Sequence, residues 1–279
     1  MLHTFRIFIM FFILGSFFSV VSIRSDDIAG LAHLFSLKIE EITPSLNMGA
    51  VYVAATNPNL RYISIREGMR KEEIASQFQT KLKWSESETA SFAESNLCTM
   101  DPIEGYLFPD VYVIPENSTP DDVKLAMKNR FEKAIGGTSI THSKNTPFDL
   151  DTVIKVASLI QREAAGKRDM NLISGIIWNR LFKDSKLEID ATLQYVKGTE
   201  ENWWPRVLAE DKYLDSPYNT YQNKGLPPSA ISNPGIAAIA AAANPTKTSC
   251  VFYIHDRYRR IHCAKTYAEH MQNVRWFLK

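Results

Sequence analysis

The stretch DTVIKVASLIQREAAG, residues Asp151–Gly166, decides how the second half of the chain folds. Apolar residues recur in it at the spacing of one helical face, which predicts an amphipathic helix packed against a core. These residues are Val153, Val156, Ala157, Ile160 and Ala164. Asp149 or Asp151 can cap the start of this helix, and Gly166 can end it.

One acidic residue, Glu163, lies on the apolar face of this predicted helix. It follows Ile160 by three residues and Val156 by seven, so its side chain projects from the same side. A carboxyl group among apolar side chains loses hydration, and its pKa rises. If it is still protonated near neutral pH, it can donate a proton to a leaving oxygen. Glu163 is therefore a candidate catalytic acid; the alternative is a solvated glutamate at the edge of the face.

The composition narrows the classes of function. The 279 residues, 45% apolar and 23% charged, are typical of a globular protein with one large domain or two small ones. A net charge of +1 without a long basic run gives no support for a nucleic-acid partner, and no glycine-rich phosphate loop is present. His255, His262 and His270 are candidate metal ligands, but the sequence lacks HExxH, so we expect no metal and no cofactor.

The N-terminal segment Ile7–Ile23 is apolar and uncharged. As a helix it would reach about 25 Å, which lies within the range of natural membrane spans. Arg6 precedes it and a mixed cluster of charges follows it, so we expect a cytoplasmic N-terminus and an exported body. The alternative is a cleaved signal peptide, but no clear A-x-A site lies near Ser22.

Export would permit a disulfide. The segments Val251–Ile254 and Ile261–Ala264 predict a hairpin, and a two-residue turn at Asp256-Arg257 would place Cys250 opposite Cys263. A bridge and a pair of free thiols both remain open, with Cys98 left over.

The first module predicts two short strands, Gly49–Thr56 and Leu60–Ile65, followed by two short helices. The first helix starts near Met69, and the second starts at a capping box formed by Ser85 and Glu88. This order resembles a small carbohydrate-binding module of the LysM type, and the alternative is a helical spacer.

Aromatic and polar residues that could contact a sugar recur in the second half. Tyr106, Phe108 and Tyr112 follow a turn at Glu104-Gly105 and could stack on sugar rings or be buried. Glu188 and Asp190 are expected to face one way from an extended segment that continues to Thr192, either as electrostatic partners or as exposed charges. The proline-rich loop Ser216–Pro234 offers the hydroxyl and amide groups of Tyr218, Asn219 and Tyr221, and its end is expected to cap a helix over Gly235–Ala243.

Seven segments together resemble the endolytic murein transglycosylases, the YceG-like family, over about Ile63–Phe277. They are EGMRKEEIA, EGYLFPDVY, VASLIQREA, WNRL, LEIDATLQY, SPYNTYQNKGLPPSAISNPG and the final FYI…H…EH. The resemblance implies an α+β protein with a membrane anchor in residues 1–27, a spacer and LysM-like module in 28–100, and a mixed α/β catalytic domain in 101–279. It also implies a bacterial inner-membrane protein with one span and a periplasmic body, working beside cell-wall synthases.

The implied activity is that of a lyase, a peptidoglycan lytic transglycosylase that ends the growth of nascent glycan strands. It cuts between N-acetylmuramic acid and N-acetylglucosamine and leaves a 1,6-anhydro end without consuming water. Glu163 falls on the family's catalytic glutamate. Asp190, Asn219 and Tyr221 are candidates to stabilise the transition state, and Thr192 and Glu104 are expected as further substrate contacts.

The chain departs from the family pattern at Gln161, Ala191 and Met271, where Glu, Pro and Asn are usual. These changes keep a second hypothesis open, that of a non-catalytic peptidoglycan-binding or scaffold protein. The retained Glu163 favours the enzyme.

Overall fold

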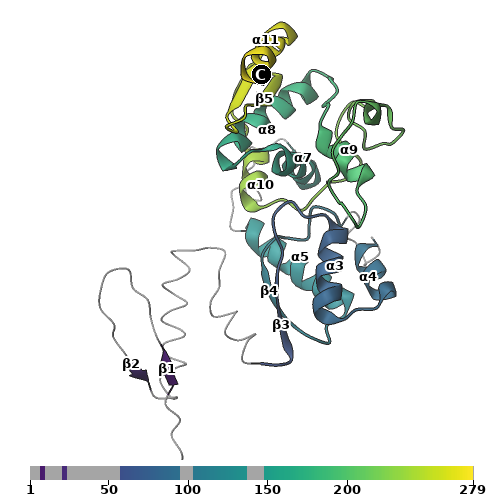
Figure 1. The fold of residues 1–279 in the computed structure, drawn as a ribbon, viewed down its shortest axis with the longest axis vertical. Coiled ribbons are helices and arrows are strands. Elements are labelled where there is room, and N and C mark those ends of the chain that lie inside the picture. Colours follow the sequence, from purple (N-terminus) through teal and green to yellow (C-terminus); the bar gives the residue numbers. More distant parts are fainter. Residues whose placement is uncertain (1–6, 10–20, 24–56, 95–102, 137–147, 279) are drawn as a thin grey trace, which may run out of the picture. The chain divides into compact units, whose positions relative to one another are not determined.

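A computed structural model describes residues 7–9, 21–23, 57–94, 103–136 and 148–278 (Figure 1). The chain divides into two units, one formed by Met1–Tyr62 with Val111–Pro115 and the other by Ile63–Asp110 with Glu116–Lys279. The fold class is α+β, since helices predominate and the strands form three two-stranded sheets among the described ranges. The boundary predicted near residue 100 falls in 95–102, outside the described residues.

The described residues of the first unit form short strands, of which the one at residues 60–64 continues into the second unit. β1 (Ile7–Ile9) pairs antiparallel with β2 (Val21–Ile23), and β3 (Leu60–Ser64) pairs with β4 (Val111–Pro115). The predicted membrane span therefore ends in strands at the positions the structure describes, while its centre and the predicted strand at 49–56 lie outside them. No helix in the described ranges has the length and apolarity needed to cross a bilayer.

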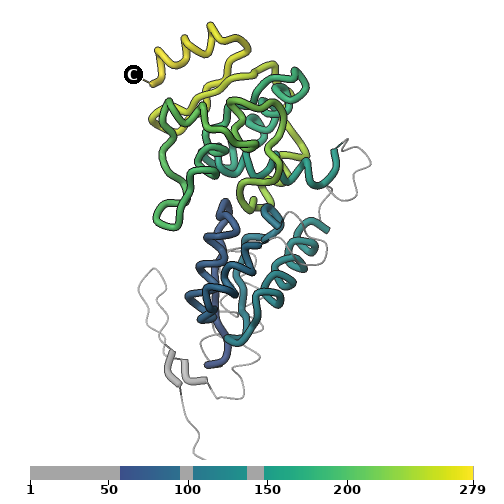
Figure 2. Tube along the Cα trace, turned by 90° about the vertical axis from the view of Figure 1, so that its right-hand side faces the viewer, coloured from purple at the N-terminus to yellow at the C-terminus, as the bar shows by residue number. Residues whose placement is uncertain are grey.

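The helices predicted after β3 are confirmed. α3 (Lys71–Leu82) and α4 (Glu86–Ala93) lie beside α5 (Pro120–Gly136) in Figure 2. The Ser85 hydroxyl accepts from the Glu88 N–H, and the Glu88 carboxylate accepts from the Ser85 N–H at 2.8 Å, which completes the expected capping box. Phe78, Trp84 and Phe92 pack on one another with ring centroids 5.6–5.8 Å apart, so α3 and α4 share a buried aromatic cluster.

The helix predicted at Asp151–Gly166 is confirmed as α7 (Leu150–Glu163) and lies at the centre of the main core. It packs against α8 (Lys167–Phe182), α9 (Asp190–Lys197) and α10 (Ile236–Ala243) (Figure 1). The Asp149 carboxylate accepts from the Thr152 N–H at 2.8 Å and caps its start. The helix ends at Glu163 rather than at Gly166, which instead precedes α8.

The aromatic residues after the Glu104-Gly105 turn are structural. Phe108 and Tyr112 are buried, and half-buried Tyr106 packs on Phe131 at 5.1 Å. Gly105 has a φ of 96°, and a Cβ there would lie 2.5 Å from the Ile154 side chain, so only glycine fits this turn against α7.

A buried amide ties this turn to distant segments. The side-chain oxygen of Asn233 accepts from the N–H groups of Gly105 and Leu107 at 2.9 and 2.8 Å. Its side-chain nitrogen donates to the Met69 carbonyl at 3.1 Å and to the Glu104 carboxyl group at 2.7 Å. Asn233 was expected to cap α10, but Gly235 occupies the cap position. The amide instead joins three segments of the chain, with its hydrogen-bonding capacity filled.

Glu104 itself is buried, with 2% of its surface exposed. It accepts hydrogen bonds from the Lys71 N–H at 3.1 Å and from the Tyr195 hydroxyl at 3.1 Å. Burial, with a smaller contribution from the Glu72 charge, raises the pKa of Glu104 to about 8, while the Lys71 N–H and Arg70 oppose that rise.

We predict that Glu104→Gln changes the dependence of stability on pH. The carboxyl group has a pKa of 4.5 in the unfolded chain and about 8 in the fold, so its stabilising contribution is complete below pH 4.5 and is lost as pH rises to 8. As pH rises through this window, the free energy of unfolding of the variant minus that of the parent should therefore increase, by up to about 1.4 kcal/mol per pH unit. Denaturant unfolding at pH 5 and pH 8 measures this, with Glu132→Gln on the exposed surface of α5 as the control. A difference independent of pH would show that Glu104 is ionised in the fold.

The C-terminal hairpin forms in a register different from the expected one. β5 (Phe252–His255) pairs with β6 (Ile261–Ala264), and Tyr253 lies opposite Cys263. The turn is therefore longer than the two residues predicted, because Asp256 accepts from the N–H groups of Tyr258 and Arg260 at 2.8 and 2.9 Å. A disulfide nevertheless joins Cys250 to Cys263, and α11 (Tyr267–Phe277) packs against both strands.

We predict that breaking the Cys250–Cys263 bridge lowers the free energy of unfolding by about 3 kcal/mol, since it closes a loop of 13 residues. Denaturant unfolding with and without reductant measures this loss. The double variant Cys250→Ser/Cys263→Ser should have the free energy of unfolding of the reduced parent, and reductant should not change it. Equal stability of oxidised and reduced protein would contradict the prediction.

Candidate active site

A cavity of about 450 Å³ opens where the end of α7, the start of α9, the proline-rich loop and the hairpin meet. Its carboxyl groups are Glu163, Glu188 and Asp190. Its cations are Arg180 and Lys212, and its aromatic side chains are Tyr221, Phe252, Tyr253, Tyr267 and His270. The cavity therefore combines acids, bases and flat apolar surfaces, as binding sites for polar ring-shaped ligands do.

Glu163 is half-buried at the last turn of α7, and the Tyr253 hydroxyl donates to its Oε2 at 2.5 Å. Burial raises the pKa of Glu163, the hydrogen bonds from Tyr253 and the Ala191 N–H lower it, and the charge of Asp190 raises it. The balance is a raised pKa, which is the property a general acid needs near neutral pH. Glu163 thus lies toward the protein, as the spacing of the apolar residues predicts, and it shares the cavity with Tyr221 of the proline-rich loop.

Asp190 is the first residue of α9, a position where the helix dipole favours negative charge. The Tyr221 hydroxyl donates to its Oδ1 at 2.6 Å. The Lys212 ammonium lies 4.7 Å from the centre of the Tyr221 ring. Asp190, Tyr221 and Lys212 thus form a connected polar wall that faces the same cavity as Glu163.

The end of α8 also contributes to the lining of the cavity. Asn179 donates to the carbonyls of Thr248 and Cys250 at 2.7 and 2.9 Å. Arg180 donates to the Val251 carbonyl at 2.6 Å and to the Glu188 carboxylate at 3.0 Å. The two residues of the WNRL segment therefore fix the start of β5 and the turn before α9 against one helix.

The segment around Glu188 and Asp190 is not the extended strand that was expected. Glu188 has a φ of 52°, in the left-handed region, and Asp190 begins a helix. Both carboxylates nevertheless line the cavity, Glu188 paired with Arg180 and Asp190 with Tyr221. Both side chains are exposed to solvent as well as paired, so each is a hydrogen-bonded charge at the surface of the cavity.

Three of the predicted substrate contacts do not line the cavity. Thr192 is fully buried and donates to the Ile189 carbonyl at 2.7 Å. Asn219 is also buried, and its side chain donates to the Leu214 carbonyl and accepts from the Tyr221 N–H. Glu104 belongs to the buried junction with Asn233. Thr192 bonds the carbonyl of Ile189, directly before Asp190, and so helps to position Asp190. Asn219 positions Tyr221 by accepting from its backbone N–H.

The sequence alone missed Tyr253, Arg180, Lys212 and the aromatic pair Phe252 and His270. Tyr253 sits on a strand whose residues are all partly exposed, so no alternation marked it. Its only signal was its place in the FYI segment of the family pattern. The ring of His270 stacks on that of Phe252 at 5.2 Å, a contact between strand and helix that no local spacing predicts.

The three histidines that were considered as metal ligands serve separate contacts. His255 pairs with Asp169 at 3.2 Å and His262 with Asp256 at 3.1 Å, while His270 stacks on Phe252. Within the described ranges, no group of three or more His, Cys, Asp or Glu side chains is arranged to hold a metal ion.

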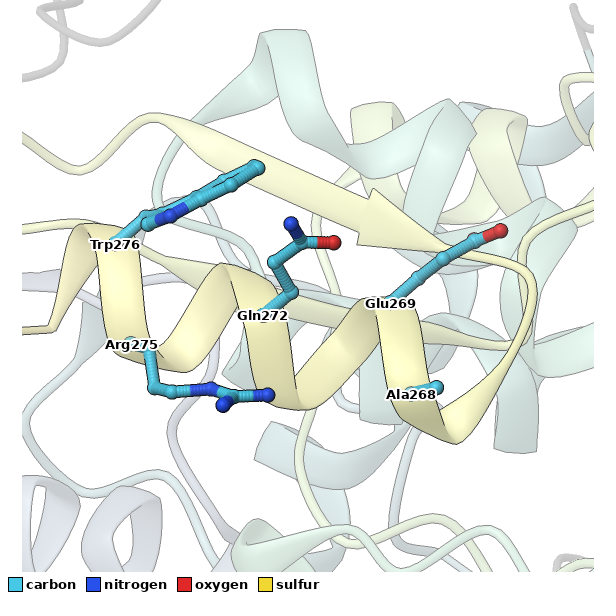
Figure 3. Close-up of a pocket in the computed structure, with 5 residues that line it drawn as sticks. All are labelled: Ala268, Glu269, Gln272, Arg275 and Trp276. Atoms are coloured by element: carbon cyan, nitrogen blue, oxygen red, sulfur yellow. The ribbon is translucent and has the colours of Figure 1, made fainter.

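A second hollow lies on the outer side of α11 (Figure 3). Trp276, Gln272 and Glu269 extend along it, and Trp276 is 65% exposed. Glu269 accepts from the Lys265 N–H at 2.8 Å, so it is engaged in the start of its own helix. The hollow contains no buried acid, which leaves the cavity at Glu163 as the stronger candidate active site.

Comparisons with known proteins identify the family of this chain. The profile of the YceG-like family matches residues 36–276. The endolytic murein transglycosylase of Bacillus subtilis (strain 168) is 29% identical over 87% of this chain and 71% of its own length. That of Streptococcus pneumoniae serotype 2 (strain D39 / NCTC 7466) is 31% identical over 62% of this chain, and the match spans 32% of that relative's length.

A crystal structure at 2.6 Å of a yceG-like protein from Listeria monocytogenes superposes with a TM-score of 0.65 at 26% identity. The superposition covers 76% of this chain and 75% of the other. Since the family profile covers most of the sequence and the described site lies inside it, the chain belongs to the YceG-like family.

Proposed function

We propose that this protein is a peptidoglycan lytic transglycosylase, a lyase that cuts glycan strands internally and leaves 1,6-anhydro-N-acetylmuramic acid ends. The observation that carries the proposal is Glu163, a carboxyl group with a raised pKa that faces a cavity of acids and aromatic rings. The names of the Bacillus and Streptococcus relatives, endolytic murein transglycosylases, support the choice of substrate and reaction.

The proposed reaction needs one acid that becomes a base. Glu163 gives its proton to the bridging oxygen as the bond from that oxygen to the anomeric carbon breaks. The C6 hydroxyl of the same sugar then attacks the anomeric carbon, and its proton returns to Glu163. No water enters, and the attack is intramolecular, so it gains from proximity. Asp190, held by Tyr221, lies in the same cavity and would stabilise the positive charge that develops on the sugar ring.

The proposed setting is the outer side of a bacterial inner membrane. A disulfide between Cys250 and Cys263 supports an oxidising compartment. The anchor proposed at Ile7–Ile23, the LysM-like role proposed for the segment of β3, α3 and α4, and cooperation with cell-wall synthases fit the same setting. By this proposal the enzyme ends the growth of nascent strands.

We predict that Glu163→Gln abolishes strand cleavage while the protein stays folded. The amide cannot donate a proton to the bridging oxygen, so the rate should fall at least 1,000-fold, about 4 kcal/mol in activation free energy. Purified glycan strands are digested, and their new ends are identified by mass spectrometry. Asp184→Asn is the control, because Asp184 is exposed and pairs with Lys224 outside the cavity.

Three outcomes of this experiment separate the hypotheses. If the parent and the control variant produce anhydro ends and Glu163→Gln produces none, the transglycosylase is supported. Ends heavier by one water would identify a hydrolase, in which Asp190 acts as the second carboxylate. A parent protein that binds strands without cutting them would establish the non-catalytic scaffold.

We predict that Asp190→Asn lowers kcat about 100-fold, because a negative charge near the developing positive charge is lost. The same change should move the alkaline limb of the pH profile to lower pH, since the Asp190 charge raises the pKa of Glu163. Initial rates of strand cleavage between pH 4 and 9 measure both effects. An unchanged kcat would remove Asp190 from the mechanism.

A further inference from the structure

We propose that Tyr253 is the positioning residue of the active site and holds Glu163 by one carboxyl oxygen so that the other oxygen carries the transferred proton. This inference rests on the proposed function. It assigns a role to a residue that is neither an acid nor a base of the reaction and whose only signal in the sequence is its place in the FYI segment.

The geometry at the acid carries the argument. The Tyr253 hydroxyl lies 2.5 Å from Oε2 of Glu163, within the cavity that both side chains line. A phenol that donates to Oε2 favours that oxygen as the acceptor of the protonated acid, which places the acidic proton on Oε1. After that proton has left, the same hydroxyl donates to a carboxylate, and such a hydrogen bond to a charged group is stronger than one to the neutral acid.

Tyr253 is suited to this role because its strand is fixed on several sides. Its cross-strand partner is Cys263, which is covalently bound to Cys250. The carbonyls of Cys250 and Val251, directly before the strand, accept hydrogen bonds from Asn179 and Arg180 of α8. The Tyr253 hydroxyl is therefore positioned by a hairpin that is cross-linked by a disulfide and hydrogen-bonded to α8, rather than by a loop.

Other charged or titratable groups near Glu163 also influence its pKa. His255 lies on the same strand as Tyr253, its ring 5.9 Å from the Tyr253 ring, and its charged form would lower the pKa of Glu163. Asp190 acts in the opposite sense. Arg162 of α7, Arg180 of α8 and Tyr221 of the loop also interact electrostatically with Glu163 or Tyr253. The backbone N–H of Ala191 also donates a hydrogen bond to the Glu163 carboxyl group, and among the side chains named here Tyr253 is the one that does so.

The test is the pH profile of Tyr253→Phe, which removes only the hydroxyl. Cleavage by a protonated acid declines as pH rises through the pKa of Glu163. Loss of a hydrogen bond that favours the carboxylate raises that pKa, so the alkaline limb of kcat should move up by about one pH unit. The plateau of kcat should fall about tenfold, while KM should change less than threefold, because the proton donor loses its orientation and the sugar contacts remain.

Two comparisons make this result specific. Tyr258→Phe removes a hydroxyl from the exposed turn of the same hairpin and should behave as the parent does. Asp190→Asn should move the same limb in the opposite direction, since it removes a charge that raises the pKa of Glu163. Thermal unfolding of each variant checks that the fold is intact, and for a variant that is destabilised the rates are taken at a temperature well below its Tm.

Each outcome decides the inference separately from the function. An upward shift of the limb with a lower kcat supports the positioning role of Tyr253. A lower kcat with an unmoved limb, or an unchanged profile, would overturn it, and the transglycosylase would still stand if Glu163→Gln is inactive. If Glu163→Gln retains cleavage, the proposed function itself fails, whatever Tyr253→Phe does.

Discussion

The structure depends on the placement of one carboxyl group at the end of a buried helix. Along α7 the residues Val153–Ile160 are buried except Lys155, so the helix cannot rotate or slide without exposing the core. Burial of such side chains contributes about 1.5–3 kcal/mol each for the larger ones, which fixes the axis and the rotation of the helix. Glu163, three residues after Ile160, is thereby forced toward the protein rather than toward water. Its raised pKa follows from that rotation.

Segments far apart in the sequence then supply what the acid lacks. The N-terminus of α9 brings Asp190, the proline-rich loop brings Tyr221, and the hairpin brings Tyr253. Each of these side chains is held by a residue that does not face the cavity: Thr220 bonds the Ile189 N–H before α9, Asn219 bonds the Tyr221 N–H, and Asn179 bonds the chain before β5. These polar residues therefore hydrogen-bond mainly to the backbone. The side chains that line the cavity are a different set, Asp190, Tyr221 and Tyr253.

This division explains what could be predicted from the sequence. The period of the apolar residues in α7, the caps at Asp149 and Ser85 and the position of Glu163 are local properties, and each was predicted correctly. Glu104, Thr192 and Asn219 were expected at the substrate because polar residues in family motifs suggest binding, yet burial places them in the framework. Tyr253 and Arg180 were missed because their roles come from contacts across 90 and 71 residues of sequence. The predicted register of the hairpin was also wrong, because the Asp256 carboxylate organises a turn longer than the two residues predicted at Asp256-Arg257.

The disulfide between Cys250 and Cys263 makes the hairpin of a newly synthesised molecule different before and after oxidation. While both thiols are still reduced, the strand that carries Tyr253 is joined to the rest of the protein only by hydrogen bonds and packing. The Tyr253 hydroxyl would therefore be held at the Glu163 carboxyl group less rigidly before the thiols are oxidised than afterwards. Under the function proposed above, the full rate of cleavage would be reached only once this disulfide has formed.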